Sequence, residues 1–240
     1  MQTVLIGIDD TDNETSPGTG SLARKVSAEC EKRGMHPCGV TRHQFLLDPA
    51  IPYTSHNSGA CVVIEGDNAW EIAQFAFEFV AGLAAEGSDP GVCLAKPEMI
   101  NDDVVAFSQD ATNKVLCMQP ALDLAKKQSI LLQGLGGTSQ GVIGALASVG
   151  LRHWGNEGRF IDMPGLRQMP RHVTIQEFKR LGIAVEHKPN GRIPTSSDVY
   201  DTLDWVRPRL ENAKPVLLVE WSSDKNVWIP VDRKKSRPLE

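Results

Sequence analysis

Close to its start, the chain carries a short apolar run that ends in a cluster of acidic side chains. Residues 4–9 (VLIGID) are apolar as far as Asp9, which predicts a buried β-strand. Asp10 and Asp12 follow in a stretch over 10–20 that is rich in Asp, Thr, Ser, Gly and Pro, as expected of a loop. Ligands of open α/β sheets bind beyond the carboxyl ends of the strands. The pattern therefore predicts a ligand site at the end of this first strand.

Asp9, Asp10 and Asp12 are predicted to hold Mg²⁺ and to take part in catalysis. Carboxylates this close repel one another at neutral pH, and a protein usually keeps them ionised by adding a cation. Mg²⁺ takes one or two carboxylates, keeps several waters and is completed by substrate phosphates, so ATP or another nucleotide is the expected partner. The alternative is that Asp and Asn here only form a tight turn and a helix N-cap.

A glycine-rich segment links this loop to the first expected helix, over residues 21–33. Gly18 and Gly20 allow the backbone to come close to a ligand, and the free N–H groups of a helix N-terminus favour an anion. Ser21 stands at the start of the helix, either as a candidate catalytic hydroxyl or simply as an N-cap residue.

A second glycine loop, GLGGTSQG over 134–141, lies between an expected strand over 129–133 and a small-residue helix over 142–149. It is not a P-loop, because no GK[ST] follows, and it lacks the third glycine of GxGxxG. Its backbone N–H groups and polar side chains are still suited to phosphate. The predicted contacts are Gly134, Gly136, Gly137, Thr138, Ser139 and Gln140. The alternative is a tight turn that packs the helix closely on the sheet.

Two polar residues, His56 and Asn57, precede an apolar segment over 58–65 that is expected to be a strand. They are predicted to reach the same edge of the sheet as the acidic loop and to contact the nucleotide there. The competing interpretation is that His56 is structural, as a lone histidine more often is.

Strands and helices alternate up to about residue 150, which predicts a layered α/β domain. Its other expected elements are strands over 39–47 and 91–95 and helices over 69–85, 97–110 and 120–127. Beyond residue 150 we expect a smaller α+β unit, with strands over 160–163, 216–221 and 227–231 and helices over 173–181 and 199–210. The fold class is therefore α/β (α+β), with one domain over 1–155 and a second over 156–240.

The net charge of −5 argues against a protein that coats nucleic acid through bulk charge. Arginines are nevertheless concentrated beyond residue 150, and the end of the chain is basic over 233–237, so RNA stays open as a partner. Four tryptophans also lie in this part and are expected to be core residues first and stacking platforms for bases second. They are Trp154, Trp205, Trp221 and Trp228.

No apolar run approaches the roughly 18–20 residues that span a bilayer, so no membrane partner is expected. The first residues lack the basic region and cleavage site of a signal peptide, which makes the cytoplasm the expected compartment. The five cysteines form no CxxC pair and are expected to be free thiols, mostly buried. Oligomeric state is not predicted.

Three sequence blocks together resemble archaeal tRNA-isoleucine agmatidine synthetase, the TiaS family. They are IGIDDTD with SPGTGS, then IPYTSHNSGA, then GLGGTSQGVIGALASVG, and they occur in the family's order over roughly residues 1–165. The combination of GIDDTD with IGALA is fairly specific. The resemblance implies a kinase-like first domain and a ferredoxin-like second one. In the family, ATP is used to phosphorylate the anticodon cytidine of a tRNA, and agmatine then displaces the phosphate.

Carried over to this chain, the resemblance assigns Asp9, Asp10 and Asp12 to Mg²⁺–ATP and Ser21 to the position of the family's phosphorylatable Thr. It places the loop over 134–141 near the nucleotide. Residues 54–58 (TSHNS) stand where the family has K-T-R-G-N, and residues 138–140 (TSQ) replace an Arg. Counterparts of the kinase-like and ferredoxin-like domains are expected, but not of the OB-fold and zinc-ribbon domains that grip tRNA.

The leading functional prediction is an ATP- and Mg²⁺-dependent enzyme of phosphoryl transfer or ligation, related to TiaS, with RNA or a small molecule as acceptor. A haloacid-dehalogenase-like phosphatase is the second interpretation, since Asp10 and Asp12 after an apolar strand match its D-x-D start. Glu14 argues against a phosphatase of this type, because its motif has Thr or Val at that position. The third is a non-catalytic module that binds nucleotide or RNA.

Overall fold

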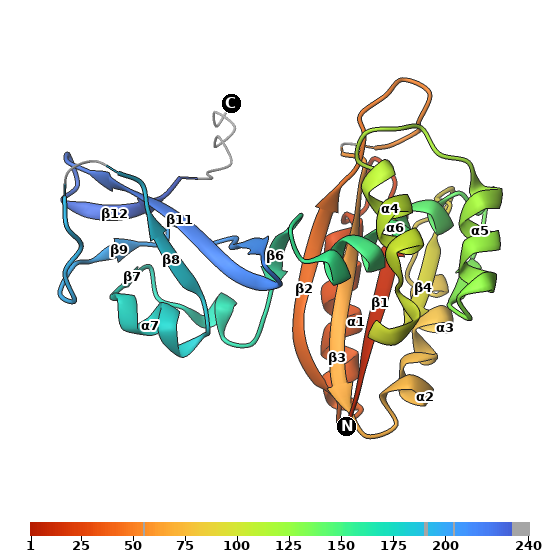
Figure 1. Ribbon diagram of the computed structural model, residues 1–240, viewed down its shortest axis with the longest axis horizontal. Helices are drawn as coiled ribbons and strands as arrows, with labels where there is room; N and C mark the ends of the chain where they lie inside the picture. Colours follow the sequence, from red (N-terminus) through yellow and green to blue (C-terminus); the bar gives the residue numbers. More distant parts are fainter. Residues whose placement is uncertain (55, 190–191, 204, 232–240) are drawn as a thin grey trace.

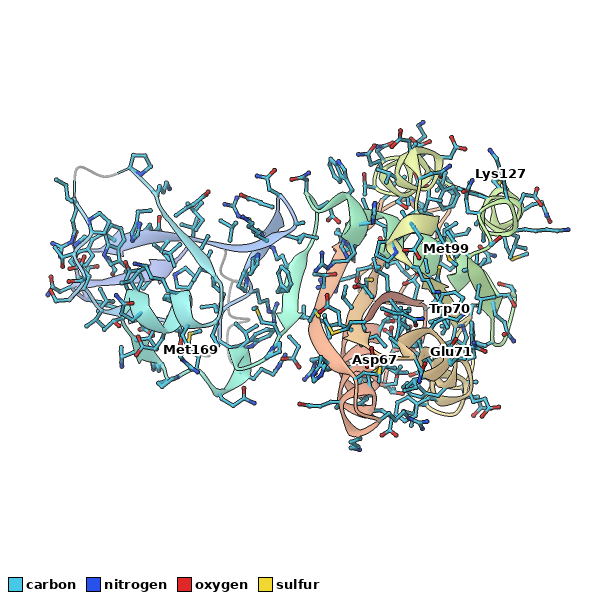
Figure 2. All side chains as sticks on the ribbon, turned by 60° about the horizontal axis from the view of Figure 1, so that its bottom comes forward. Asp67, Trp70, Glu71, Met99, Lys127 and Met169 are labelled. Carbon is cyan, nitrogen blue, oxygen red and sulfur yellow. The ribbon has the colours of Figure 1, made fainter. Side chains whose placement is uncertain are left out.

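The computed structural model describes residues 1–54, 56–189, 192–203 and 205–231. These residues form two parts that lie side by side, with the N-terminal part on the right in Figure 1 and the C-terminal part on the left. Figure 2 shows the same two parts with their side chains, Trp70 and Met99 in the first and Met169 in the second. The described strands nevertheless belong to one sheet that runs through both parts.

The N-terminal part is built on antiparallel strands. Their order is β5 (Leu131–Gly134), β4 (Gly91–Ala95), β1 (Gln2–Asp9), β3 (Ser58–Gly66) and β2 (His36–Gln44). All five strands were expected near these positions and are confirmed. The rule that located the ligand site, however, belongs to parallel sheets and does not apply here. The acidic end of β1 instead lies beside the start of β4, with Asp9 opposite Gly91.

Helices cover both faces of these strands, because successive residues of a strand point to opposite sides. The even-numbered apolar residues of β1 pack in the core beneath α1 (Thr19–Lys32), α2 (Ala69–Ala73) and α3 (Phe75–Ala81). Leu5 packs in the core beneath α4 (Asp102–Asp110), α5 (Met118–Lys127) and α6 (Gly141–Trp154). Gly7 permits the close approach of α6, since a Cβ there would lie 2.0 Å from the Ala145 carbonyl oxygen.

Two expected helices differ in detail from the structure. The helix expected over 69–85 is divided into α2 and α3 at Gln74, whose carbonyl accepts from the N–H three residues on instead of four. The helix expected over 97–110 begins later, after the 3-10 turn η1 (Pro97–Met99). The Asn101 side chain caps α4 by accepting from the Val104 N–H at 3.2 Å.

The C-terminal part extends the sheet from β2. β6 (Arg159–Asp162) pairs with β2 on one side and with β10 (Arg209–Glu211) on the other. The sheet continues through β11 (Lys214–Ser222), β12 (Val227–Pro230), β9 (Tyr200–Asp201) and β7 (His172–Val173), and β8 (Ala184–His187) pairs with β11. Its core centres on Trp228 and Tyr200, with Phe178 from α7 (Ile175–Arg180) and Leu166 from the turn η2 (Leu166–Gln168).

The prediction of a helix over 199–210 is wrong. Its described residues form β9 and β10, because Leu203 has a left-handed φ of 61° and Pro208 has no N–H for a helical hydrogen bond. The described residues after 155 therefore hold one α-helix, α7, whereas a ferredoxin-like βαββαβ unit has two. The α+β class is confirmed, but the ferredoxin-like arrangement is not.

Four further expectations concern the chain as a whole. The domain division between residues 155 and 156 stays a prediction, and β6, which follows it, joins the two parts of the sheet by pairing with both β2 and β10. Among the described helices, none has both the length and the apolar character needed to cross a membrane. The five cysteines are free, and three of them, Cys30, Cys61 and Cys93, are buried. The basic tail over 233–237 lies outside the described residues.

Candidate active site

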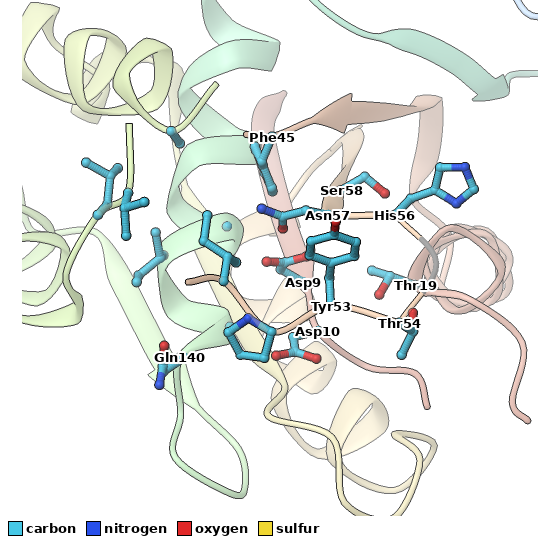
Figure 3. Close-up of a pocket in the computed structure, with 18 of the residues that line it drawn as sticks. Asp9, Asp10, Thr19, Phe45, Tyr53, Thr54, His56, Asn57, Ser58 and Gln140 are labelled. Atoms are coloured by element: carbon cyan, nitrogen blue, oxygen red, sulfur yellow. The ribbon is translucent and has the colours of Figure 1, made fainter. Parts of the chain in front are cut away.

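A pocket opens at the acidic end of β1. About 840 Å³ of empty space, open mouth included, lies among β1, the start of α1, the N-terminus of α6 and the segments over 45–58 and 111–116. Figure 3 shows Asp9 and Asp10 in the middle of the lining side chains, with Thr19 and Thr54 on one side and Gln140 on the other. The structure therefore brings the acidic loop together with segments that are far apart in the sequence.

Asp9 and Asp10 are half-buried carboxyl groups at the centre of this pocket. Burial, together with the charge of Asp10, raises the pKa of Asp9 to about 8. Burial and the charges of Asp89 and Asp12 raise the pKa of Asp10 to about 6. Both groups therefore favour a bound proton, or a cation in its place, at neutral pH.

Asp9 is seated against α6 by a glycine. A Cβ at Gly144 would lie 1.8 Å from Asp9 Oδ2 and 2.8 Å from a ring carbon of Phe45. Only glycine at this position lets the helix and the carboxyl group pack together. The small-residue helix expected after the second glycine loop thus has a direct part in building the site.

Asp12 lines the same pocket but is held by hydrogen bonds. Its Oδ1 accepts from the backbone N–H of Thr19 at 3.0 Å and from the Thr19 hydroxyl at 2.8 Å. Its Oδ2 accepts from the Thr54 hydroxyl at 2.8 Å. Asp12 therefore caps α1 and ties the segment over 45–58 to it, so the turn-and-cap alternative explains this residue well.

Of the three candidates around the start of α1, none lines the pocket. Ser21 is half-buried, and its hydroxyl accepts from Arg24 at 3.5 Å. A Cβ at Gly20 would meet Ile161 of β6 at 2.9 Å, so this glycine permits packing. Gly18 is the N-cap residue of α1. The hydroxyl that α1 brings to the pocket is that of Thr19, which was not predicted although it lies within the same TGS sequence.

The second glycine loop reaches the pocket only at its end, through Gln140 and Gly141. The residues before them enclose the carboxylate of Asp89, which accepts from the Thr138 N–H at 2.6 Å and from the Thr138 hydroxyl. Gly137 has a φ of 55°, and a Cβ there would overlap Asp89 Oδ1. Gly134 packs in the same way against Ser139. The contacts expected at Gly134, Gly136, Gly137, Thr138 and Ser139 are therefore not brought to the pocket.

His56 and Asn57 both line the pocket, as expected. His56 is exposed at the rim. Asn57 is half-buried and donates through Nδ2 to the carbonyl oxygen of Leu46 at 2.7 Å, while its own carbonyl oxygen accepts from the Phe45 N–H at 2.9 Å. Asn57 therefore holds the segment over 45–57 in shape, beside the acids.

An apolar wall of the pocket was not predicted. It combines Ile51, Pro52 and Tyr53 with Val115, Leu116 and Ile143. Tyr53 and Val115 are 44% and 49% exposed, so both present apolar surface at this wall. A pocket with acids on one side and apolar side chains on another suits a nucleotide, whose base and phosphates differ in the same way.

A preformed all-protein metal centre is absent from the described residues, since no three His, Cys, Asp or Glu side chains are placed to hold an ion. Mg²⁺ does not require one, because one or two carboxylates, waters and substrate phosphates complete its shell. Asp9 and Asp10, with their raised pKa values, fit that role.

Comparison with known proteins finds similarity to TiaS proteins. The chain is 28% identical over 151 residues to the tRNA 2-agmatinylcytidine synthetase TiaS from Methanocorpusculum labreanum, a match that covers 61% of this chain and 34% of that protein. The solved complex of a TiaS with its tRNA and ATP matches 62% of the chain with a TM-score of 0.54 at 28% identity. A structure described as a tRNA fluorescent labeling enzyme matches 62% with a TM-score of 0.52 at 28% identity.

Over about three fifths of its length this chain is similar to TiaS in sequence and in fold. No family model matches it. The chain spans about a third of the length of these TiaS relatives, as it covers 36% of each of the two solved chains. The relatives' sequence similarity and fold together confirm the resemblance that was drawn from GIDDTD and the second glycine loop.

Proposed function

We propose that this chain is an ATP- and Mg²⁺-dependent enzyme that transfers a phosphoryl group or ligates an acceptor, as TiaS-like proteins do. The observation that supports it most is the pair of half-buried carboxyls, Asp9 and Asp10, which line one pocket and have pKa values raised to about 8 and about 6. Similarity to a protein solved with ATP points to the same ligand.

The lining residues divide the pocket into two ends. Asp9 and Asp10 would hold Mg²⁺, which neutralises the phosphates of ATP and polarises the bond that breaks. Gln140, just before α6, lies at this end, and its side-chain amide can donate to a phosphate. Tyr53 and Val115 belong to the apolar wall and would receive the base.

We take Thr19, rather than Ser21, as the candidate acting hydroxyl, because Thr19 lines the pocket and Ser21 does not. Thr19 Oγ1 donates to Asp12 at 2.8 Å and accepts from the buried Thr11 hydroxyl at 3.2 Å. Asp12 is thus positioned to withdraw the Thr19 proton. Replacing Ser21 by Ala should leave turnover unchanged, and replacing Thr19 by Val should lower it.

The first test is thermal melting with ATP, with and without Mg²⁺. A ligand that binds only the folded state raises Tm, and at a hundred times its Kd it adds about 2.7 kcal/mol. The expected result is a rise that needs both ATP and Mg²⁺ and is lost in Asp10→Asn. The exposed Asp224→Asn is the control and should keep it. A wild-type protein that shows no rise with any nucleotide contradicts the proposal.

Two alternatives are separated by further outcomes. A haloacid-dehalogenase-like phosphatase would form an aspartyl-phosphate at Asp10, which can be trapped and located by mass spectrometry. A non-catalytic module would bind ATP without turnover in the presence of RNAs and amines. The tRNA named for the relatives makes RNA the acceptor class to assay first.

A further inference from the structure

Asp89 stands just before β4 and binds the second glycine loop at two places. Its carboxylate accepts from the Thr138 N–H at 2.6 Å and from the Thr138 hydroxyl. Its backbone carbonyl oxygen accepts from the N–H of Gly141, the first residue of α6, at 3.0 Å. One residue therefore fixes both the glycine loop and the start of the helix that follows it.

The backbone around Asp89 leaves it little freedom. Pro90 follows, and the residue before a proline is restricted to extended backbone. The Pro90 carbonyl oxygen accepts from the Leu135 N–H at 2.7 Å, which ties this segment to the residue after β5. Within the described ranges no Lys, Arg or His forms an ion pair with Asp89. Hydrogen bonds from Thr138 therefore hold its carboxylate in place.

The start of α6 is packed against the acids without room for a shift. A Cβ at Gly141 would overlap the Asp89 carbonyl oxygen and would lie 3.1 Å from Asp10 Cβ. Three residues further along α6, a Cβ at Gly144 would overlap Asp9 Oδ2. Close-packed interiors transmit strain, so a displacement of the start of α6 is carried to both carboxyl groups.

We propose that Asp89 is a positioning residue, which holds α6 in place against β1 and thereby sets the geometry of Asp9 and Asp10. Asp89 is half-buried and does not line the pocket, so it acts on a ligand only through the residues that it holds. Its effect on a bound metal ion rests on the proposed function, whereas its effect on the docking of α6 does not.

Thr138→Val tests the positioning without changing any charge, because it replaces the hydroxyl that binds Asp89 by a methyl group. Thr138→Ser keeps the hydroxyl. Electron paramagnetic resonance measures the affinity for Mn²⁺, in place of Mg²⁺, with a non-hydrolysable ATP analogue. Residues that orient metal ligands typically contribute about 10–100-fold to affinity. Thr138→Val should weaken Mn²⁺ binding by about the lower figure, Asp89→Ala by more, and Thr138→Ser should retain it.

Hydrogen exchange over residues 135–145, followed by mass spectrometry, measures the docking of α6 in the protein without ligands. Loss of hydrogen bonds to a charged acceptor should speed exchange of these amides about tenfold or more in Asp89→Ala. Thr138→Val should also exchange faster, and Thr138→Ser should behave as wild type.

The matched control is Asp201→Asn, which breaks a similar carboxylate clamp in the C-terminal part. Asp201 Oδ1 accepts from the Leu203 N–H at 2.8 Å and from Arg171 at 3.0 Å. This variant should lower Tm but leave the Mn²⁺ affinity and the exchange over 135–145 unchanged.

Wild-type Mn²⁺ affinity in Thr138→Val would overturn the proposal, even if Asp89→Ala loses affinity, because Asp89 would then act through its charge alone. Weaker binding in Thr138→Val that Thr138→Ser restores, at a Tm no lower than that of Asp201→Asn, supports it. If the wild-type protein binds no Mn²⁺ with the nucleotide, the proposed function fails. Exchange over 135–145 then decides by itself whether Asp89 positions α6.

Discussion

Replacement of Asp9 by Asn should stabilise the protein, and more so as the pH rises. The pKa of Asp9 is raised from 3.8 to about 8, chiefly by burial. The folded state therefore binds a proton that the unfolded state has lost between these two pH values, and stability falls as pH rises through this window. Asn carries no charge and removes this dependence.

The magnitude follows from the same pKa change. At about 1.4 kcal/mol for each pKa unit, full ionisation of Asp9 in the empty pocket costs about 6 kcal/mol. Water penetration and movement of the loop reduce such penalties, so we expect Asp9→Asn to gain about 2–4 kcal/mol at pH 8.5. At pH 4.5 the folded-state carboxyl is protonated and almost isosteric with the amide, so the gain should be below about 1 kcal/mol.

Urea unfolding of wild type and Asp9→Asn at pH 4.5 and 8.5 measures both values, since the free energy of unfolding extrapolates linearly to zero denaturant. Asp224→Asn, in the exposed turn between β11 and β12, controls for the loss of one negative charge. A gain that is equal at the two pH values, or no gain at pH 8.5, refutes the argument that ionisation of the half-buried Asp9 destabilises the folded state. Addition of Mg²⁺ and ATP should stabilise wild type and leave Asp9→Asn unchanged.

Three other variants test the rest of the structure. Gly144→Ala should lower stability by about 1–3 kcal/mol and abolish the response to ATP and Mg²⁺, because the new Cβ would overlap Asp9 Oδ2; melting curves measure both. Thr19→Val removes the hydroxyl bond to Asp12 and should cost about 1 kcal/mol in urea unfolding, against less than about 0.5 kcal/mol for Ser21→Ala. In the C-terminal part, burial raises the pKa of Asp198, but hydrogen bonds from Trp228, Thr195 and Arg192 outweigh it and hold the pKa below its usual range. Asp198→Asn should therefore cost about 1–3 kcal/mol at pH 7 and progressively less below about pH 4, in urea unfolding at each pH.

The local patterns of the N-terminal part carry most of the information about its fold. Apolar runs such as residues 4–8 and 60–64 predicted strands, and Gly34, directly after the helix expected over 21–33, marked a helix end, because these signals act within a few residues. The local patterns did not predict whether the strands run parallel or antiparallel. Antiparallel pairing of β1 with β3 and β4 depends on where the intervening helices cross, which no local pattern states.

In the C-terminal part, local patterns failed where tertiary contacts decide the backbone. The segment over 199–210 has apolar residues at helical spacing, but Tyr200 is drawn into the core beside Trp228, and Asp201 pairs with Arg171 at 3.0 Å. These partners are distant in the sequence. They outweigh the weak helix propensity of a segment that contains Pro208.

The candidate site, too, was predicted only in part from local patterns. Clustering of Asp9, Asp10 and Asp12 pointed to the pocket because three acids within four residues need an explanation wherever they lie. The sequence did not reveal which group the amides of the second glycine loop bind. Asp89 precedes β4, and nothing in its neighbourhood in the sequence indicates that it occupies the amides around Thr138. That carboxylate fills the place expected for a phosphate.

The presence of Asp89 in the glycine loop has an electrostatic consequence for ATP. The loop amides are already neutralised by a carboxylate. Lys114, the one lysine among the described lining residues, pairs with Asp110 at 2.8 Å. A triphosphate that enters the pocket therefore meets Asp9 and Asp10 with little positive charge to offset them. Binding of ATP should depend on Mg²⁺ far more steeply here than in a P-loop, where lysine and free amides hold the phosphates. Isothermal titration with and without Mg²⁺ measures this directly, and equal affinity in both cases would place the phosphates away from the acids.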